Sequence, residues 1–306
     1  MKNRFQSGTG CDIIPCECFL KRYCIVKKFK GILLVLLSVM MLVPGCCRAD
    51  RYKVLDAALS MLEEGNPFLV HYNEDTGADI KARYPLGCPY FWGGRHESRI
   101  LHIASPEQAS DYYQTDKQYL YGFDCAGFTR WVMAQAGYAE HDSISNLLDF
   151  NKYKEYVNYP ASKVTGDDRT TELRVGDLVA ILHPDGGHHI AMYIGTLLDY
   201  GYTRHNLPAE LVPYLYYPLL IHCTGSSDYY ERYRTYLEEN GMENVLPPFG
   251  GVVVTLLDAP ASDAPYRTPE VEGLESEPCF DLEGYHLQVT SLENERRIRW
   301  IRWKQK

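Results

Sequence analysis

The sequence predicts an α+β fold in which a cysteine begins a helix and an antiparallel sheet follows along the chain. Two observations predict this class. An amphipathic segment begins at Cys125, and residues 176–195 hold two apolar segments separated by a turn sequence. Residues 51–306 are long enough to form one enlarged domain of this kind.

The helix prediction rests on apolar side chains at the i, i+3, i+4 and i+8 positions of one stripe: Phe128, Trp131, Val132 and Ala136. Gly137 follows the stripe as a stop signal. Cys125 falls in the first turn, where unpaired backbone N–H groups and the helix dipole favour a thiolate. A free cysteine is also often just a small buried apolar side chain, so both interpretations stay open at this point.

Residues 176–195 predict a β-hairpin whose turn lies at 184–187. On its second strand, His189 shares a face with Tyr193, and a neighbouring helix terminus can lie against that face. A neutral imidazole there takes the proton of the thiol and leaves an ion pair that attacks a carbonyl carbon. The adjacent His188 is the alternative candidate for the base, and it is expected to lie in the turn.

A third polar residue is expected to hold the second ring nitrogen of the base. His222 is the candidate, because it lies in the apolar run 219–223 that predicts the next strand of the same sheet. A lone histidine in an apolar strand is also often a core group whose hydrogen bonds are satisfied, and that alternative stays open. A helix at about 52–64 and a strand at 252–257 complete the expected core.

Four segments resemble the pattern of the NlpC/P60 family of cell-wall cysteine peptidases, which are papain-like. In the family's order, the chain has Tyr-Phe-Trp-Gly-Gly, Asp-Cys-Ala-Gly-Phe, Gly-Asp-Leu and His-Ile-Ala-Met-Tyr-Ile-Gly, at residues 90–94, 124–128, 176–178 and 189–195. Each motif alone is weak evidence, but four in register, spread over about residues 88–257, are fairly specific.

The resemblance implies a papain-like core, with the nucleophile cysteine at a helix N-terminus packed on an antiparallel sheet and enlarged by loop insertions. It implies Cys125 as the nucleophile, His189 as the base and His222 as the orienting residue. Tyr90 and Asp124 are the implied substrate contacts beside the thiol. The implied substrates are peptidoglycan stem peptides, and the chemistry requires no metal or organic cofactor.

The chain departs from the family pattern in three places. Ala126 stands where the family usually has serine, and residues 95–121 and 197–218 form insertions. The first insertion holds four tyrosines, which either wall a substrate groove or pack the loop down: Tyr112, Tyr113, Tyr119 and Tyr121.

Asp124 and Asp177 form a carboxylate pair of the kind that a glycosidase uses. We discount that interpretation, because each residue stands beside a turn glycine or a helix start, where aspartate accepts backbone hydrogen bonds.

Residues 1–50 have the features of a leader. A basic flank at 27–30 precedes a 13-residue apolar stretch at 31–43, which predicts a secretory signal too short for a comfortable membrane span. Residues 42–46 resemble a bacterial lipobox, which makes Cys46 a candidate for lipidation and anchoring at the cell surface. The alternatives are cleavage nearby, which releases a secreted protein, and a membrane helix.

Beyond the leader we expect a catalytic domain at 51–258, followed by an acidic, proline-rich loop and a C-terminal β-hairpin within 259–306. The basic run at 296–304 in this hairpin predicts either an edge strand protected by arginines or a strip that binds the wall or a membrane surface.

Residues 51–306 carry 23 Lys and Arg against 37 Asp and Glu, a net charge of −14. This charge excludes nucleic acid as a partner, because binding to phosphates requires clustered cations. The sequence therefore predicts a secreted or lipid-anchored bacterial thiol peptidase, and it leaves protein partners unknown. An amidase or acyltransferase with the same residues and an inactive wall-binding domain remain as alternatives.

Overall fold

The computed structural model describes residues 46–81, 88–98, 100, 121–138, 156–160, 173–182, 188–225, 238–239, 251–257, 266–267, 277–282, 285–290 and 297–303. The leader up to residue 45 and the predicted turn at 184–187 lie outside the described residues.

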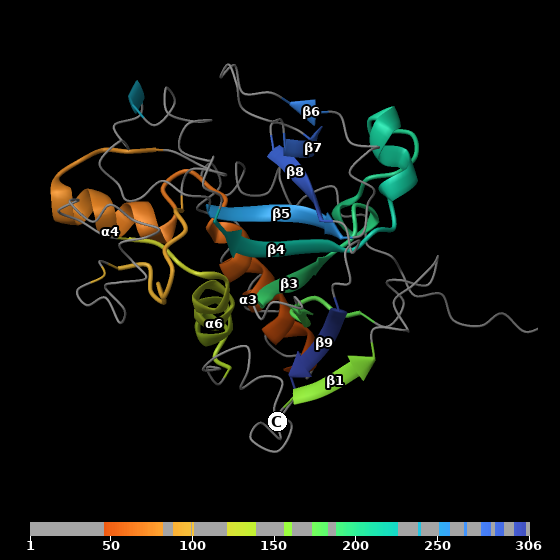
Figure 1. Ribbon diagram of the computed structural model, residues 1–306, viewed down its shortest axis with the longest axis horizontal. Coiled ribbons are helices and arrows are strands. Elements are labelled where there is room, and N and C mark those ends of the chain that lie inside the picture. The colour runs from red at the N-terminus through yellow and green to blue at the C-terminus, as the bar shows by residue number, and fades with distance from the viewer. Residues whose placement is uncertain are drawn as a thin grey trace, which may run out of the picture.

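The strands in the described part of the chain form one sheet in the order β1-β9-β2-β3-β4-β5-β8-β7-β6 (Figure 1). Neighbouring strands are antiparallel, except that β5 and β8 run parallel. The strands are β1 (Tyr156–Pro160), β2 (Leu178–Leu182), β3 (His189–Gly195), β4 (Leu219–Thr224), β5 (Gly251–Leu257), β6 (Tyr266–Arg267), β7 (Glu277–Leu282), β8 (Tyr285–Thr290) and β9 (Arg297–Trp303).

Helix α6 (Cys125–Gln135) packs on β3 and β4, and α3 (Cys46–Ser60) packs on α6. The period-two alternation of β3 sorts its side chains between two cores. Met192 joins the core beneath these helices, whereas Tyr193 joins a second buried cluster on the opposite face of the sheet. The α+β class and the cysteine helix on an antiparallel sheet are therefore confirmed.

The local predictions hold for the strands around the site. The predicted hairpin is confirmed, since β2 and β3 pair in a register that places Ile181 opposite His189. The helix expected at 52–64 is present as α3, which begins earlier, at Cys46, and ends earlier, at Ser60. No helix of the described chain combines the length and the hydropathy that crossing a membrane requires.

Helix α4 (Pro67–Thr76) was missed, although its sequence carries the usual boundary signals. The side chain of Asn66 accepts a hydrogen bond from the Leu69 N–H at 3.1 Å, and Pro67 occupies the first turn. Gly77 ends the helix in the left-handed conformation, with φ of 74°.

The C-terminal hairpin expected from the sequence is wrong in its pairing. β8 pairs with β5 and β7, whereas β9 lies between β1 and β2. Trp300 and Ile301 on β9 are each 1% exposed and belong to the two cores on opposite faces of the sheet. Since β9 is hydrogen-bonded to β1 on one side and to β2 on the other, the expected edge strand is wrong as well.

An ion pair fastens β9 to the turn before β2. Arg302 donates from Nε and Nη2 to the two carboxylate oxygens of Asp177 at 2.8 and 2.6 Å, and Asp177 also accepts from the Arg174 N–H at 2.9 Å. The two side chains are only 11% and 3% exposed. The fork of the guanidinium therefore matches the carboxylate in a largely dry setting.

We expect Arg302→Met to lower the free energy of unfolding by about 3–5 kcal/mol, because it leaves the Asp177 carboxylate buried without its counter-ion. Urea denaturation measures the change. The matched control is the double variant Arg302→Met/Asp177→Asn, which removes both charges and is expected to lose less than the single variant. Equal stability of Arg302→Met and the wild type would contradict this account.

Candidate active site

The start of α6 is fixed by the side chain of Asp124. Its backbone is extended, with φ of −88° and ψ of 178°, and one carboxylate oxygen accepts from the Gly127 N–H at 2.6 Å. The other oxygen accepts from the Gly93 N–H at 2.9 Å. The expected capping role of Asp124 is thus confirmed, and the same carboxylate ties the loop of residues 90–94 to the cysteine helix.

Glycines in both motifs allow this loop and the helix to touch through their backbones. The Asp124 N–H donates to the Gly94 carbonyl at 3.1 Å. A Cβ atom on Gly127 would lie 1.8 Å from that same carbonyl oxygen, and one on Gly94 would lie 2.1 Å from the carbonyl oxygen of Gly122. No side chain fits at either position, which explains why glycine stands in both motifs.

Tyr90 lies beside the cysteine loop, half-buried, in an isolated parallel bridge with Phe123. Gly225, directly after β4, sits against its ring, because a Cβ there would come within 2.7 and 2.9 Å of two ring carbons. The ring of Tyr90 is therefore held between the cysteine loop and the end of the strand that carries His222.

Cys125 is the first residue of α6 and is half-buried. The pKa of its thiol is raised to about 12, chiefly by burial and also by the neighbouring Asp124 carboxylate, against the lowering effect of the N–H groups of Ile190, Ala126 and Cys125 itself. The helix start thus acts in the expected direction, but burial outweighs it. A thiol in this setting stays protonated at neutral pH and needs a base.

The effect of the Ile190 N–H on the pKa of the thiol indicates where the sulfur lies. Ile190 is the second residue of β3 and follows His189 directly. The thiol therefore lies at the start of the strand that presents His189.

His189, His222 and Thr255 form a hydrogen-bonded chain across three strands. Nε2 of His189 lies 2.8 Å from Nδ1 of His222, and Nε2 of His222 lies 2.6 Å from Oγ1 of Thr255. The two imidazole rings meet edge to face, with centroids 4.8 Å apart. His222 is 7% exposed, and burial together with His189 holds its pKa well below the usual value. His222 is accordingly neutral at neutral pH.

The sheet register explains why these three side chains meet. Tyr193 on β3 pairs with Leu220 on β4, which pairs in turn with Thr255 on β5. His189 and His222 each lie an even number of residues from a member of this row, so alternation places all three polar side chains on the face of Tyr193, opposite the face that α6 covers. They lie on a diagonal of that face, where long side chains on neighbouring strands reach one another.

The expectation that a helix lies against the Tyr193 face is therefore wrong for α6, and Cys125 comes near the pair only at the start of β3, where the Ile190 N–H lowers the pKa of its thiol.

Thr255 is a part of this chain that sequence reasoning missed. The only available signal was a single hydroxyl in the otherwise apolar run 252–257. His188, the rival of His189, has its Nδ1 buried without a hydrogen-bond partner and takes no part in the chain.

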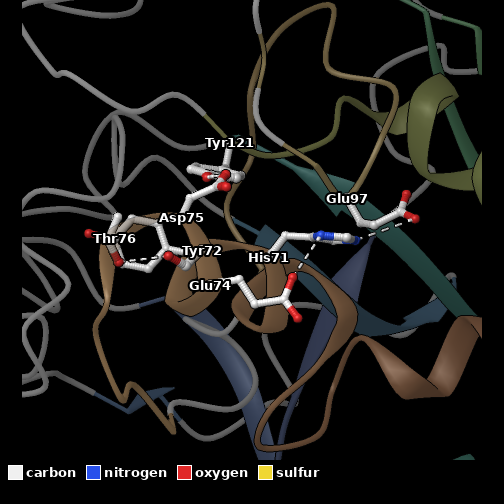
Figure 2. Close-up of polar contacts among 7 residues, drawn as sticks. All are labelled: His71, Tyr72, Glu74, Asp75, Thr76, Glu97 and Tyr121. Atoms are coloured by element: carbon white, nitrogen blue, oxygen red, sulfur yellow. Dashed lines mark hydrogen bonds and ion pairs between the residues drawn. The ribbon is translucent and has the colours of Figure 1, made fainter.

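Helix α4 contacts both ends of the first insertion (Figure 2). The Tyr121 hydroxyl donates to the Asp75 carboxylate at the end of the insertion, and His71 lies 4.0 Å from Glu97 near its beginning. These contacts bring the ends of the 95–121 segment to the same helix.

Tyr121 itself is fully buried, and its ring packs edge-on against Phe68 and Tyr72 at centroid distances of 5.2 and 5.4 Å. Tyr121 therefore packs the loop down and does not line a groove. The other three lie outside the described residues: Tyr112, Tyr113 and Tyr119. In the second insertion, Leu211 and Tyr214 are buried in the main core, so that segment adds to the body of the domain.

Residues 87–206 match the model of the NlpC/P60 family, so the chain contains an NlpC/P60 family domain. Members of this family are typically papain-like cysteine peptidases and cell-wall hydrolases, generally extracytoplasmic. The matched segment includes Cys125 and His189 and ends before His222. No curated protein and no solved structure matches the chain.

We expect Gly127→Ala to destabilise the protein by about 3 kcal/mol, since the added methyl collides with the Gly94 carbonyl. Without that collision, alanine within a helix stabilises by about 1 kcal/mol relative to glycine. Thermal and urea unfolding measure the effect. Gly137→Ala is the control: its surroundings are open and only its φ of 81° is unfavourable, so we expect a loss of about 1 kcal/mol. A stabilised Gly127→Ala variant would refute the close backbone contact.

Proposed function

We propose that this protein is an extracytoplasmic bacterial cysteine peptidase that hydrolyses peptide bonds of peptidoglycan stem peptides through Cys125, His189 and His222. One observation carries the proposal. His189 begins the strand whose next residue, Ile190, lowers the pKa of the Cys125 thiol through its N–H, and Nε2 of His189 lies 2.8 Å from Nδ1 of His222. These two contacts support the assignment of Cys125 as nucleophile, His189 as base and His222 as orienting group for acyl transfer.

In the proposed mechanism, Nδ1 of His189 takes the proton of the Cys125 thiol while its Nε2–H stays bonded to His222. The thiolate attacks the carbonyl carbon of the substrate, and the backbone N–H of Cys125 at the helix start stabilises the developing oxyanion. The imidazolium then returns the proton to the leaving amine, which leaves a thioester. His189 next deprotonates a water molecule that hydrolyses the thioester and restores the thiol.

The raised pKa of Cys125 favours base-assisted attack over a standing ion pair. A buried thiolate beside the Asp124 carboxylate is unfavourable, so the proton leaves the sulfur only when the imidazole accepts it. The imidazolium that forms beside His222 is tolerated because His222 stays neutral.

Tyr90 and Asp124 are the proposed substrate contacts. Tyr90 presents a half-buried ring next to the cysteine loop. Both oxygens of Asp124 accept backbone N–H groups, so Asp124 contributes by holding the loop in the shape that receives the peptide.

We further propose that residues 1–50 direct export and that Cys46 is the lipidation site of an anchored form. The catalytic core is placed at 51–258, and residues 259–306 supply β6, β7, β8 and β9 to its sheet. No cofactor takes part in the proposed chemistry.

We expect purified protein to release new amino groups from bacterial peptidoglycan. Cys125→Ala and His189→Ala should each lower this release by at least about 1000-fold, because nucleophile and base act as one unit. His188→Ala is the matched control and should retain the activity, since His188 lies outside the hydrogen-bonded chain. Acyl transfer or amide cleavage on other substrates with an inert wall would favour the amidase or acyltransferase instead. Wall binding without release by the wild type would favour a binding domain.

We expect the rate of Cys125 alkylation by iodoacetamide to show how far the reactivity of the thiol depends on His189. With His189→Ala, the pKa of about 12 lies above the accessible range, so the thiolate fraction and the rate should rise about tenfold per pH unit from pH 6 to 10. The wild type should react faster near neutral pH, because His189 accepts the proton. Peptide mass mapping follows Cys125 alone. A rate plateau below pH 9 in His189→Ala would show that the thiol pKa is not raised.

A further inference from the structure

The contact between His222 and Thr255 lies one step behind the proposed catalytic residues. Oγ1 of Thr255 is 2.6 Å from Nε2 of His222, and the threonine is 0% exposed. An apolar side chain would satisfy the packing of this strand. Burying a hydroxyl costs free energy unless it is hydrogen-bonded, so its bond to His222 indicates a role for this residue.

We propose that Thr255 is a positioning residue that stabilises the productive tautomer of His222 and, through it, the tautomer and orientation of His189. The proposal rests on the function proposed above for Cys125 and His189. It assigns the Thr255 hydroxyl the role of acceptor for the Nε2–H of His222.

The positions of the protons determine which group donates in each of these hydrogen bonds. For His189 to take a proton from the thiol through Nδ1, its Nε2 must carry the hydrogen and donate it. The partner at 2.8 Å is Nδ1 of His222, which must then be the unprotonated acceptor. A neutral imidazole has one N–H, so His222 carries it on Nε2 and donates it to Thr255.

The opposite direction of the same bonds gives an inactive site. If His222 carried its proton on Nδ1, it would donate to Nε2 of His189, and His189 would then carry its proton on Nδ1. That nitrogen could no longer accept the proton of Cys125. The two arrangements have nearly the same atomic positions, so the choice between them depends on what faces the Nε2 of His222.

A suitable group is needed at Nε2 of His222 because the orienting residue is a histidine. A carboxylate can only accept from the base, and its direction is fixed, whereas a neutral histidine accepts or donates with equal ease at Nδ1. Burial keeps His222 neutral by lowering its pKa, so charge cannot impose the direction either. A threonine hydroxyl can accept or donate, so it satisfies Nε2 in either tautomer; without it, the productive tautomer leaves a buried Nε2–H unpaired, which is costly, and the hydroxyl therefore makes that tautomer available.

The comparison of Thr255→Val with Thr255→Ser tests the proposal in the full chain. Valine keeps the shape and removes the hydroxyl, whereas serine keeps the hydroxyl. For Thr255→Val we expect kcat to fall roughly 10- to 1000-fold with KM nearly unchanged, since the loss comes from the wrong tautomer. For Thr255→Ser we expect kcat within about threefold of the wild type.

Two readouts do not depend on turnover of wall substrate. Long-range 1H–15N correlation spectra report the protonated nitrogen of His222, whose signals are assigned by their loss in His222→Asn. We expect the Nε2–H form in the wild type and in Thr255→Ser, and the Nδ1–H form in Thr255→Val. The alkylation rate of Cys125 at neutral pH should fall in Thr255→Val alone.

These readouts keep the two proposals separable. A protein that does not cleave the wall but shows the expected tautomers and alkylation rates refutes the proposed substrate and supports the role of Thr255. An Nδ1–H form of His222 in the wild type overturns the role of Thr255, as does Thr255→Val with an unchanged tautomer or alkylation rate. If Thr255→Val does not fold, Thr255→Ala replaces it and the wild-type tautomer still decides.

Discussion

The backbone contact between the glycine loop at residues 90–94 and the first turn of α6 fixes the place of Cys125, the proposed nucleophile. Asp124 binds an N–H group on each side of this contact, and the absence of side chains on Gly94 and Gly127 allows the two backbones to meet. Because Cys125 follows Asp124 directly, any shift of this contact moves the sulfur relative to β3. Two motifs separated by the 95–121 insertion thus act as one structural unit.

Burial at this contact has a chemical cost that the neighbouring strands offset. It raises the pKa of the Cys125 thiol, so the helix start alone does not supply a thiolate. In the proposed mechanism, the base must therefore hold its accepting nitrogen toward the sulfur before any substrate arrives. The chain from His189 through His222 to Thr255 supports this orientation, and the neutral His222 suits a buried site where a second charge would be unfavourable.

Periodic apolar patterns made the centre of the fold predictable from sequence. The cysteine helix and the strands that carry His189 and His222 have patterns long enough to indicate both their type and their buried face. The pairing of β8 and β9 was not predictable in this way, because burial on both faces of β9 rather than closeness in the chain selects its partners. Thr255 was hidden for a related reason: its bond joins residues 33 apart, and threonine suits any strand.

The position of β9 links the C-terminal segment to the chemistry. β9 pairs with β2, which pairs with β3, the strand that begins with His189. The ion pair of Arg302 with Asp177 fixes the same end of β2, and the Tyr193 N–H donates to the Asp177 carbonyl at 2.8 Å. Through these bonds β9, which lies beyond the family domain, helps to fix the position of β3 within the sheet. Because a hydrogen-bonded chain across three strands tolerates little displacement, we expect the geometry of the site to depend on this distant segment as well as on the motifs of the family.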